Sequence, residues 1–127
     1  MENIHSRTLA LIGEEAMTKL HGARVAVFGL GGVGSYIAEA LARAGVGSLL
    51  LIDGDEIAPS NLNRQLFATA DTVGMRKTDA ARERITQIDI LLSSVNEDLE
   101  KKKARLDVVS GEAKKREASQ KLLNDIN

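Results

Sequence analysis

The stretch FGLGGVGSYIAEALARAG, residues 28–45, decides the fold of this chain. Its glycines Gly29, Gly31 and Gly34 follow the spacing G-x-G-x-x-G, which occurs where a strand turns into a helix beside a nucleotide phosphate. Glycine permits the tight turn and lets a phosphate approach the backbone. The first N–H groups of the following helix have no acceptor within that helix, so an anion fits there.

The flanking sequence has the pattern of a βαβ unit. RVAVFG (residues 24–29) and SLLLID (residues 48–53) are short apolar runs typical of buried parallel strands. Between these two runs, apolar residues recur at helical intervals. This pattern ends at Gly45, and glycine commonly ends helices. Residues 7–20 are expected to form a helix with Gly13 as a candidate break. The predicted fold class is therefore α/β: a partial Rossmann-like βαβ nucleotide-binding unit followed by a long charged helix or helical hairpin.

A polar cluster after the second apolar run indicates the kind of nucleotide. Asp53 lies 19 residues after Gly34, where a carboxylate can accept hydrogen bonds from ribose hydroxyls. The residues that follow it are Asp55, Asn61, Asn63, Arg64, Gln65 and, further on, Lys77. Arginine and lysine suit a triphosphate, whose charge they stabilise, so the cluster favours ATP. Two alternatives stay open: an NAD-binding fragment, and a solvated loop whose charged residues pair with each other.

Composition and charge exclude several classes of protein. The 127 residues carry a net charge of −1 and include no cysteine, which rules out a disulfide framework, a thiolate metal site and a thiol nucleophile. No metal-ligating residues are predicted. No apolar run approaches the roughly 18 residues that a membrane-spanning helix needs. Because the first residues also lack the layout of a signal peptide, a cytoplasmic protein without a membrane partner is expected.

The last third of the chain is a different kind of sequence. Residues 90–127 are highly charged and contain neither proline nor aromatic residues. Steps of three and four residues from Ile85 give 13 positions, of which nine are apolar, and the pattern is good as far as Val109. Ser110–Gly111 is a candidate break between two helices. The predicted organisation is an ATP-binding half-domain, residues 1–89, and a helical tail, residues 90–127, that pairs as a coiled coil or folds back on the sheet.

The sequence RVAVFGLGGVGSYIAEALARAGVGSLLLIDGDEIAPSNLNRQLFATADTVGMRK resembles the ThiF/MoeB/ubiquitin-activating-enzyme superfamily. IGEEAM before the first strand and NLNRQ after the second are most similar to the subgroup of tRNA threonylcarbamoyladenosine dehydratases (TcdA, also called CsdL). The resemblance covers about residues 5–89. It implies an enzyme that uses ATP and magnesium to adenylylate a carboxylate, here that of the threonylcarbamoyl side chain on tRNA, before this side chain cyclises.

The resemblance also implies a role for individual residues. The residues implied to act on the triphosphate are Arg64, Lys77 and Arg7, of which the last reaches across a homodimer into the partner's ATP site. The residues implied to bind ATP are Gly29, Gly31, Gly32, Gly34, Asp53, Asp55, Asn61 and Gln65. Among these, the glycines lie beside the phosphates and Asp53 binds the ribose. Gln65 supports the polar residues that contact the triphosphate.

Several features depart from the family. Arg76 stands where a proline usually precedes the lysine, and Ile88–Asp89–Ile90 replaces the usual INP. Family members have roughly twice this length, and no residue here matches their magnesium-binding aspartate. Only two strands are clearly encoded, so something must cover them. We therefore expect an ATP-binding portion that is inactive alone, with a non-catalytic nucleotide-binding or oligomerisation module as the alternative.

Overall fold

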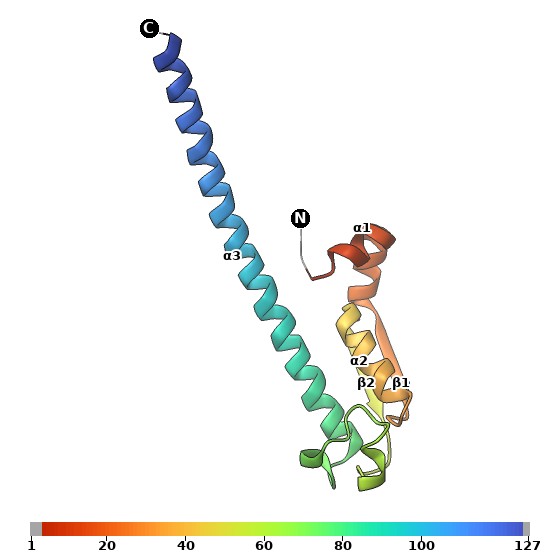
Figure 1. Cartoon of the computed structure of the whole chain (residues 1–127). Helices are drawn as coiled ribbons and strands as arrows, with labels where there is room; N and C mark the ends of the chain where they lie inside the picture. Colours follow the sequence, from red (N-terminus) through yellow and green to blue (C-terminus); the bar gives the residue numbers. More distant parts are fainter. Residues whose placement is uncertain (1–3, 126–127) are drawn as a thin grey trace. The chain divides into compact units, whose positions relative to one another are not determined.

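The computed structural model describes residues 4–125 and has a mixed α/β fold (Figure 1). Helix α1 (Ser6–Gly22) is followed by strand β1 (Arg24–Phe28), helix α2 (Gly34–Ala44) and strand β2 (Ser48–Ile52). Two short 3-10 helices, η1 (Pro59–Asn61) and η2 (Ala70–Thr72), lie in the loop before helix α3 (Lys77–Asp125). The chain divides into two compact units after Ser93. The predicted α/β class is confirmed, whereas the domain boundary at residues 89 and 90 stays a prediction.

The two strands form the predicted βαβ unit. They pair in parallel, with Arg24 opposite Ser48 and Phe28 opposite Ile52, and α2 connects them. The connection ends as the sequence predicts, because Gly45 adopts a left-handed conformation with φ of 87° and its N–H donates to the carbonyl of Ala42.

Helix α1 contains the predicted break. Gly13 has φ of 79° and ψ of 168°, values outside the helical region, so two shorter helices meet there. The left-handed φ is open to glycine at little cost. The candidate break at Gly13 is confirmed.

One face of the sheet is packed and the other is bare. The core consists of residues from β1 and the turn after it, α2, the long loop and the start of α3: Val27, Leu30, Ala38, Ile57, Phe67, Ala68, Ala80 and Ala81. The opposite face exposes Phe28 by 77%, Leu50 by 61% and Ile52 by 38%. A parallel sheet normally has both faces covered. The sequence led us to expect that other parts of the protein cover the strands. Within residues 4–125, this is so for one face of the sheet.

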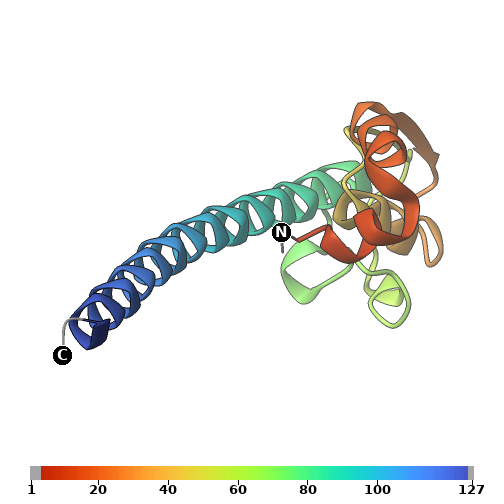
Figure 2. The ribbon, with the colours of Figure 1, turned by 90° about the horizontal axis from the view of Figure 1, so that it is seen from above.

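Helix α3 runs without interruption from Lys77 to Asp125 (Figures 1 and 2). The helical-hairpin alternative, with a break at Ser110–Gly111, was therefore wrong. A glycine in a helix interior costs only about 1 kcal/mol relative to alanine. The neighbouring glutamate, alanine, lysine and arginine residues favour the helix, so a single glycine does not end it.

The turn between β1 and α2 depends on a close backbone contact. Gly29 has φ of 86°, and its carbonyl oxygen lies where a Cβ at Gly34 would be. The third glycine of the motif is thus required by packing, independently of any ligand.

We expect Gly34→Ala to destabilise the fold by about 3 kcal/mol or more, because the new methyl group overlaps backbone that cannot rotate away. Urea denaturation followed by circular dichroism measures the change. Gly54→Ala is the matched control, since its Cβ meets nothing within 4 Å and its φ is not in the left-handed range. Equal stability of the two variants would contradict the packing role.

Candidate functional site

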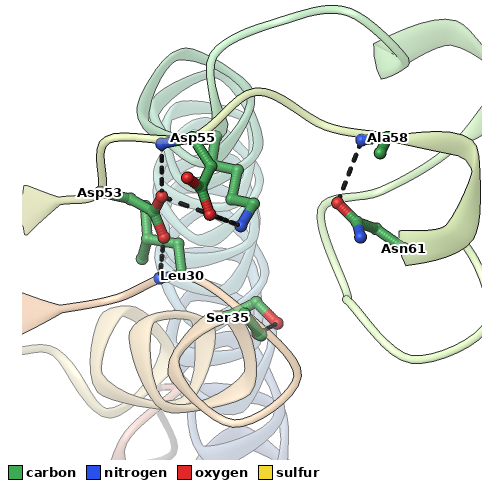
Figure 3. Close-up of polar contacts among 8 residues, drawn as sticks. Leu30, Ser35, Asp53, Asp55, Ala58 and Asn61 are labelled. Carbon is green, nitrogen blue, oxygen red and sulfur yellow. Dashed lines mark hydrogen bonds and ion pairs between the residues drawn. The ribbon is translucent and has the colours of Figure 1, made fainter.

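The carboxylate of Asp53 connects the ends of the two strands (Figure 3). Asp53 follows β2, and its side chain is only 8% exposed. Its Oδ2 accepts a hydrogen bond from the Leu30 backbone N–H at 2.6 Å, and its Oδ1 accepts one from the Asp55 backbone N–H at 2.8 Å. The predicted ribose-binding acid thus lies against the glycine turn after β1, with acceptor capacity left on both oxygens.

Lys77 adds a positive charge beside this carboxylate. It is the first residue of α3, and its side chain is 9% exposed. Its Nζ donates to Asp55 Oδ2 at 2.9 Å and lies 3.8 Å from Asp53 Oδ1. The Lys77 backbone N–H also donates to the Asp55 carbonyl, beside an antiparallel bridge between Glu56 and Arg76. Arg76, at the position of the expected proline, therefore takes part in the contact that places the lysine.

The environment keeps Asp53 ionised. Burial by itself raises the pKa of this carboxyl, but the N–H donors of Leu30 and Asp55 and the ammonium of Lys77 outweigh it. The net result is a pKa below its ordinary value of 3.8. At neutral pH the site therefore presents a carboxylate that only accepts hydrogen bonds, as a ribose diol requires.

A buried hydroxyl holds the glycine loop, and sequence reasoning missed it. Ser35, fully buried in the first turn of α2, donates from Oγ to the Gly31 carbonyl at 2.6 Å. The same Oγ accepts a hydrogen bond from the Leu66 backbone N–H at 3.1 Å. The signal was available, because a small hydroxyl residue directly follows Gly34, the last glycine of the motif. Ser35 thus connects the loop to the long segment after β2.

The segment around Arg64 and Gln65 lies against the glycine loop. A Cβ at Gly32 would be 3.4 Å from the Arg64 carbonyl oxygen, and a Cβ at Gly31 would be 3.8 Å from Gln65 Nε2. Gln65 is buried, whereas Arg64 is exposed. The Arg64 guanidinium donates from Nη1 to the Ser60 carbonyl at 2.6 Å, a contact within its own turn.

Asn61 is buried and shapes the same turn. Its Oδ1 accepts a hydrogen bond from the Ala58 backbone N–H at 3.0 Å (Figure 3). The alternative that charged residues only pair with each other fits Lys77 and Asp55. It does not fit Arg64, which has no aspartate or glutamate partner among residues 4–125.

Besides the contact of Lys77 with Asp55, helix α3 has a polar contact with α2. Arg84 donates from Nε to Glu39 Oε2 at 3.0 Å and from Nη2 to Oε1 at 3.2 Å, and Arg43 donates to the same carboxylate. The hydrogen bond from Arg84 is the main reason that the pKa of Glu39 lies below its ordinary value. A bidentate arginine–carboxylate pair is geometrically specific. It therefore orients the helix that begins with Lys77.

The structure brings together most, but not all, of the candidate residues. The glycine loop, Asp53, Asp55, Lys77 and the segment from Asn61 to Gln65 form one site. Arg7 lies exposed in the first turn of α1, and within residues 4–125 no hydrogen bond or ion pair joins it to the other candidates. Its role across a homodimer stays a prediction.

A cluster of metal-ligating side chains is absent from the described residues. Between residues 4 and 125 no group of three or more histidine, aspartate or glutamate side chains could hold a metal ion. The two carboxylates nearest the loop already accept hydrogen bonds from backbone N–H groups and from Lys77. The described residues therefore include no ready-made cluster of three protein ligands for magnesium. Within the same range, no helix is long and apolar enough to cross a membrane.

Fold and site together define a nucleotide-type βαβ unit with an acid and a lysine at the strand ends, and comparison with known proteins gives the family. The model of the ThiF family matches residues 5–120, so the chain belongs to the ThiF family. This confirms the resemblance that the motifs indicated.

Individual relatives and solved structures show which members of the family the chain is similar to. It is 50% identical over 84 residues to a tRNA threonylcarbamoyladenosine dehydratase of Bacillus subtilis, covering 66% of this chain and 33% of the relative. It is 43% identical over 86 residues to a molybdopterin-synthase adenylyltransferase of Escherichia coli, with shares of 66% and 33%. The crystal structure of the Escherichia coli dehydratase TcdA in complex with ATP matches with a TM-score of 0.63 and 47% identity, covering 65% and 34%. The chain thus spans about a third of the length of these relatives.

The lowered pKa of Asp53 predicts a pH dependence of stability. Because the folded pKa lies below the unfolded value, near 3.8, the unfolded chain binds more protons between the two values. The stabilisation from Asp53 is therefore complete above the unfolded value and is lost as pH falls through the folded pKa. We expect Asp53→Asn to cost about 2 kcal/mol at pH 7, and the difference from wild type to shrink as pH falls from the unfolded pKa to the folded pKa.

Urea denaturation from pH 7 to pH 2.5 measures this difference. Asp71→Asn, which changes an exposed carboxylate in η2, is the control and should leave the profile unchanged. A constant gap between Asp53→Asn and wild type at all pH values would show that the lost stability does not come from the ionised carboxylate.

Proposed function

We propose that this chain is the ATP-binding portion of an adenylylating enzyme that activates a carboxylate. The glycine loop and the N-terminus of α2 bind the phosphates, Asp53 accepts hydrogen bonds from the ribose, and Lys77 and Arg64 neutralise the triphosphate. The support comes from the geometry of the site and from the relatives, one of which was crystallised with ATP.

The observation that carries the proposal is the position of Lys77 beside Asp53. A ribose-binding acid at the end of the second strand fits any nucleotide. A buried ammonium 3.8 Å from that acid adds a cation at the edge where phosphates bind, and this favours a polyphosphate. Because Asp55 accepts a hydrogen bond from this ammonium at 2.9 Å, the lysine is fixed beside Asp53 before a nucleotide arrives.

The proposed reaction needs little covalent chemistry from the protein. A substrate carboxylate attacks the α-phosphate of ATP, and pyrophosphate leaves with the electron pair of the broken P–O bond. The residues described here bind the nucleotide, hold it in one orientation and stabilise the charge that develops on the phosphates. No step is assigned to a protein-held magnesium ion, since residues 4–125 contain no cluster of three histidine, aspartate or glutamate side chains for one.

The relatives indicate the substrate class. The dehydratases act on threonylcarbamoyladenosine in tRNA, as their name states. We extend this to the present chain: the carboxylate is that of the threonylcarbamoyl side chain, and tRNA is the partner that carries it. The net charge of −1 adds no support for RNA binding, so this part of the proposal depends on the 50% identity alone.

Binding of ATP with magnesium to the full chain, measured by calorimetry, tests the proposal. We expect wild type to bind ATP and Arg64→Ala to bind it about tenfold more weakly, because one charge-assisted contact is worth about 1.4 kcal/mol. Lys77→Met, which keeps the apolar part of the side chain, should weaken binding at least as much. Arg82→Ala is the control, since Arg82 is an exposed arginine of α3 whose ion-pair partner among residues 4–125 is Asp79.

Each outcome has a clear meaning. Unchanged ATP affinity in both Arg64→Ala and Lys77→Met would reject the assigned roles, and tighter binding of NAD than of ATP would favour the dinucleotide alternative. ATP–pyrophosphate exchange with a carboxylate tests catalysis separately. Our prediction from the sequence is that ATP binding is retained and exchange is absent; exchange by this chain would show that it is an enzyme by itself.

A further inference from the structure

The turn that carries Arg64 is closed by its own backbone. The N–H groups of Arg64 and Gln65 both donate to the Asn61 carbonyl, at 3.1 Å and 3.0 Å. Phe67 and Ala68, which follow this turn, are buried in the core. Apolar packing therefore keeps the turn close to the sheet, but such packing is not directional and does not fix how the turn faces the glycine loop.

Ser35, in the first turn of α2 (Figure 3), supplies a directional contact for this turn. Its hydroxyl has one proton, which it donates to the Gly31 carbonyl at 2.6 Å, so the oxygen accepts hydrogen bonds from other groups. It accepts one from the Leu66 N–H at 3.1 Å, directly after the turn. Among residues 4–125, this is the hydrogen bond that joins the loop of residues 54–76 to α2. Because Ser35 is fully buried, the contact is shielded from competing water.

The direction of the turn matters because of the long side chain of Arg64. The Arg64 carbonyl oxygen would lie 3.4 Å from a Cβ at Gly32, so its backbone borders the glycine loop. The exposed guanidinium bonds only weakly to the fold, through the Ser60 carbonyl of its own turn. A small tilt of the backbone is amplified along this side chain. The tilt therefore decides whether the guanidinium reaches a phosphate that is bound at the loop.

Under the proposed function, on which this inference rests, we propose that Ser35 is a positioning residue for Arg64. Its hydroxyl holds the turn in the direction from which Arg64 contacts the phosphates of ATP. Ser35 itself touches no nucleotide, because it is fully buried and its hydroxyl is engaged with the Gly31 carbonyl and the Leu66 N–H. Its effect on binding passes through the arginine.

Calorimetry of the full chain with ATP and magnesium tests the role of the hydroxyl. Ser35→Ala keeps the first turn of α2, because the Ser35 backbone N–H also donates to the Gly31 carbonyl, at 3.1 Å. We expect this variant to bind ATP at least about threefold more weakly than wild type, the size of one lost hydrogen bond.

Thr72→Val is the matched control for a purely structural effect. The Thr72 hydroxyl has the same two roles as that of Ser35, since it donates to the Phe67 carbonyl at 2.8 Å and accepts a hydrogen bond from the Thr69 N–H at 2.8 Å. Both variants should unfold at a lower urea concentration than wild type. Only Ser35→Ala should weaken ATP binding, because the contacts of Thr72 do not reach the glycine loop.

A double variant tests whether Ser35 acts through Arg64. In an Arg64→Ala background, Ser35→Ala should weaken ATP binding by less than about twofold, because the guanidinium that it positions is absent. Additive losses would overturn the inference, and so would unchanged ATP affinity in Ser35→Ala or an equal loss in Thr72→Val. Each of these results leaves ATP binding by wild type, and with it the proposed function, intact. A wild-type chain that binds no ATP would instead reject both.

Discussion

The two hydrogen bonds that the Asp53 carboxylate accepts are the interaction on which the rest of the site depends. One fixes the glycine turn after β1, and the other fixes the start of the loop after β2. Hydrogen bonds to a charged group contribute about 1.5–3 kcal/mol each, a large share of the 5–15 kcal/mol that stabilises a typical domain. One side chain thus couples the two strand ends, and it does so at the edge of the sheet where α/β proteins bind ligands.

The sequence predicted the features that depend on neighbours along the chain. The strands, the helix between them, its end at Gly45 and the break at Gly13 follow from local periodicity and from the backbone freedom of glycine. The side-chain contacts that depend on the loop of residues 54–76 could not be predicted from the sequence, because the path of this loop depends on tertiary contacts. The contacts of Lys77 with Asp55 and of Ser35 with Leu66 are of this kind. The candidate break at Ser110–Gly111 failed because a single glycine is a weak signal against strong helix formers.

The two basic residues of the site differ in a way that composition could not show. Lys77 is buried and already has a carboxylate partner, whereas Arg64 is exposed and bonds within its own turn. Under the proposed function, an arriving triphosphate therefore meets one cation that is fixed and one that must rearrange. A charge that is already fixed can orient the ligand without a further loss of side-chain freedom.

The bare face of the two-stranded sheet affects how the isolated chain behaves in solution. Phe28, Leu50 and Ile52 form a patch of aromatic and aliphatic side chains without a polar residue among them. Patches of this kind recruit other apolar surfaces, whether a molecular chaperone, a fluorescent hydrophobic probe or a neighbouring chain. The yield of soluble material on expression will therefore respond to polar substitutions at these three positions.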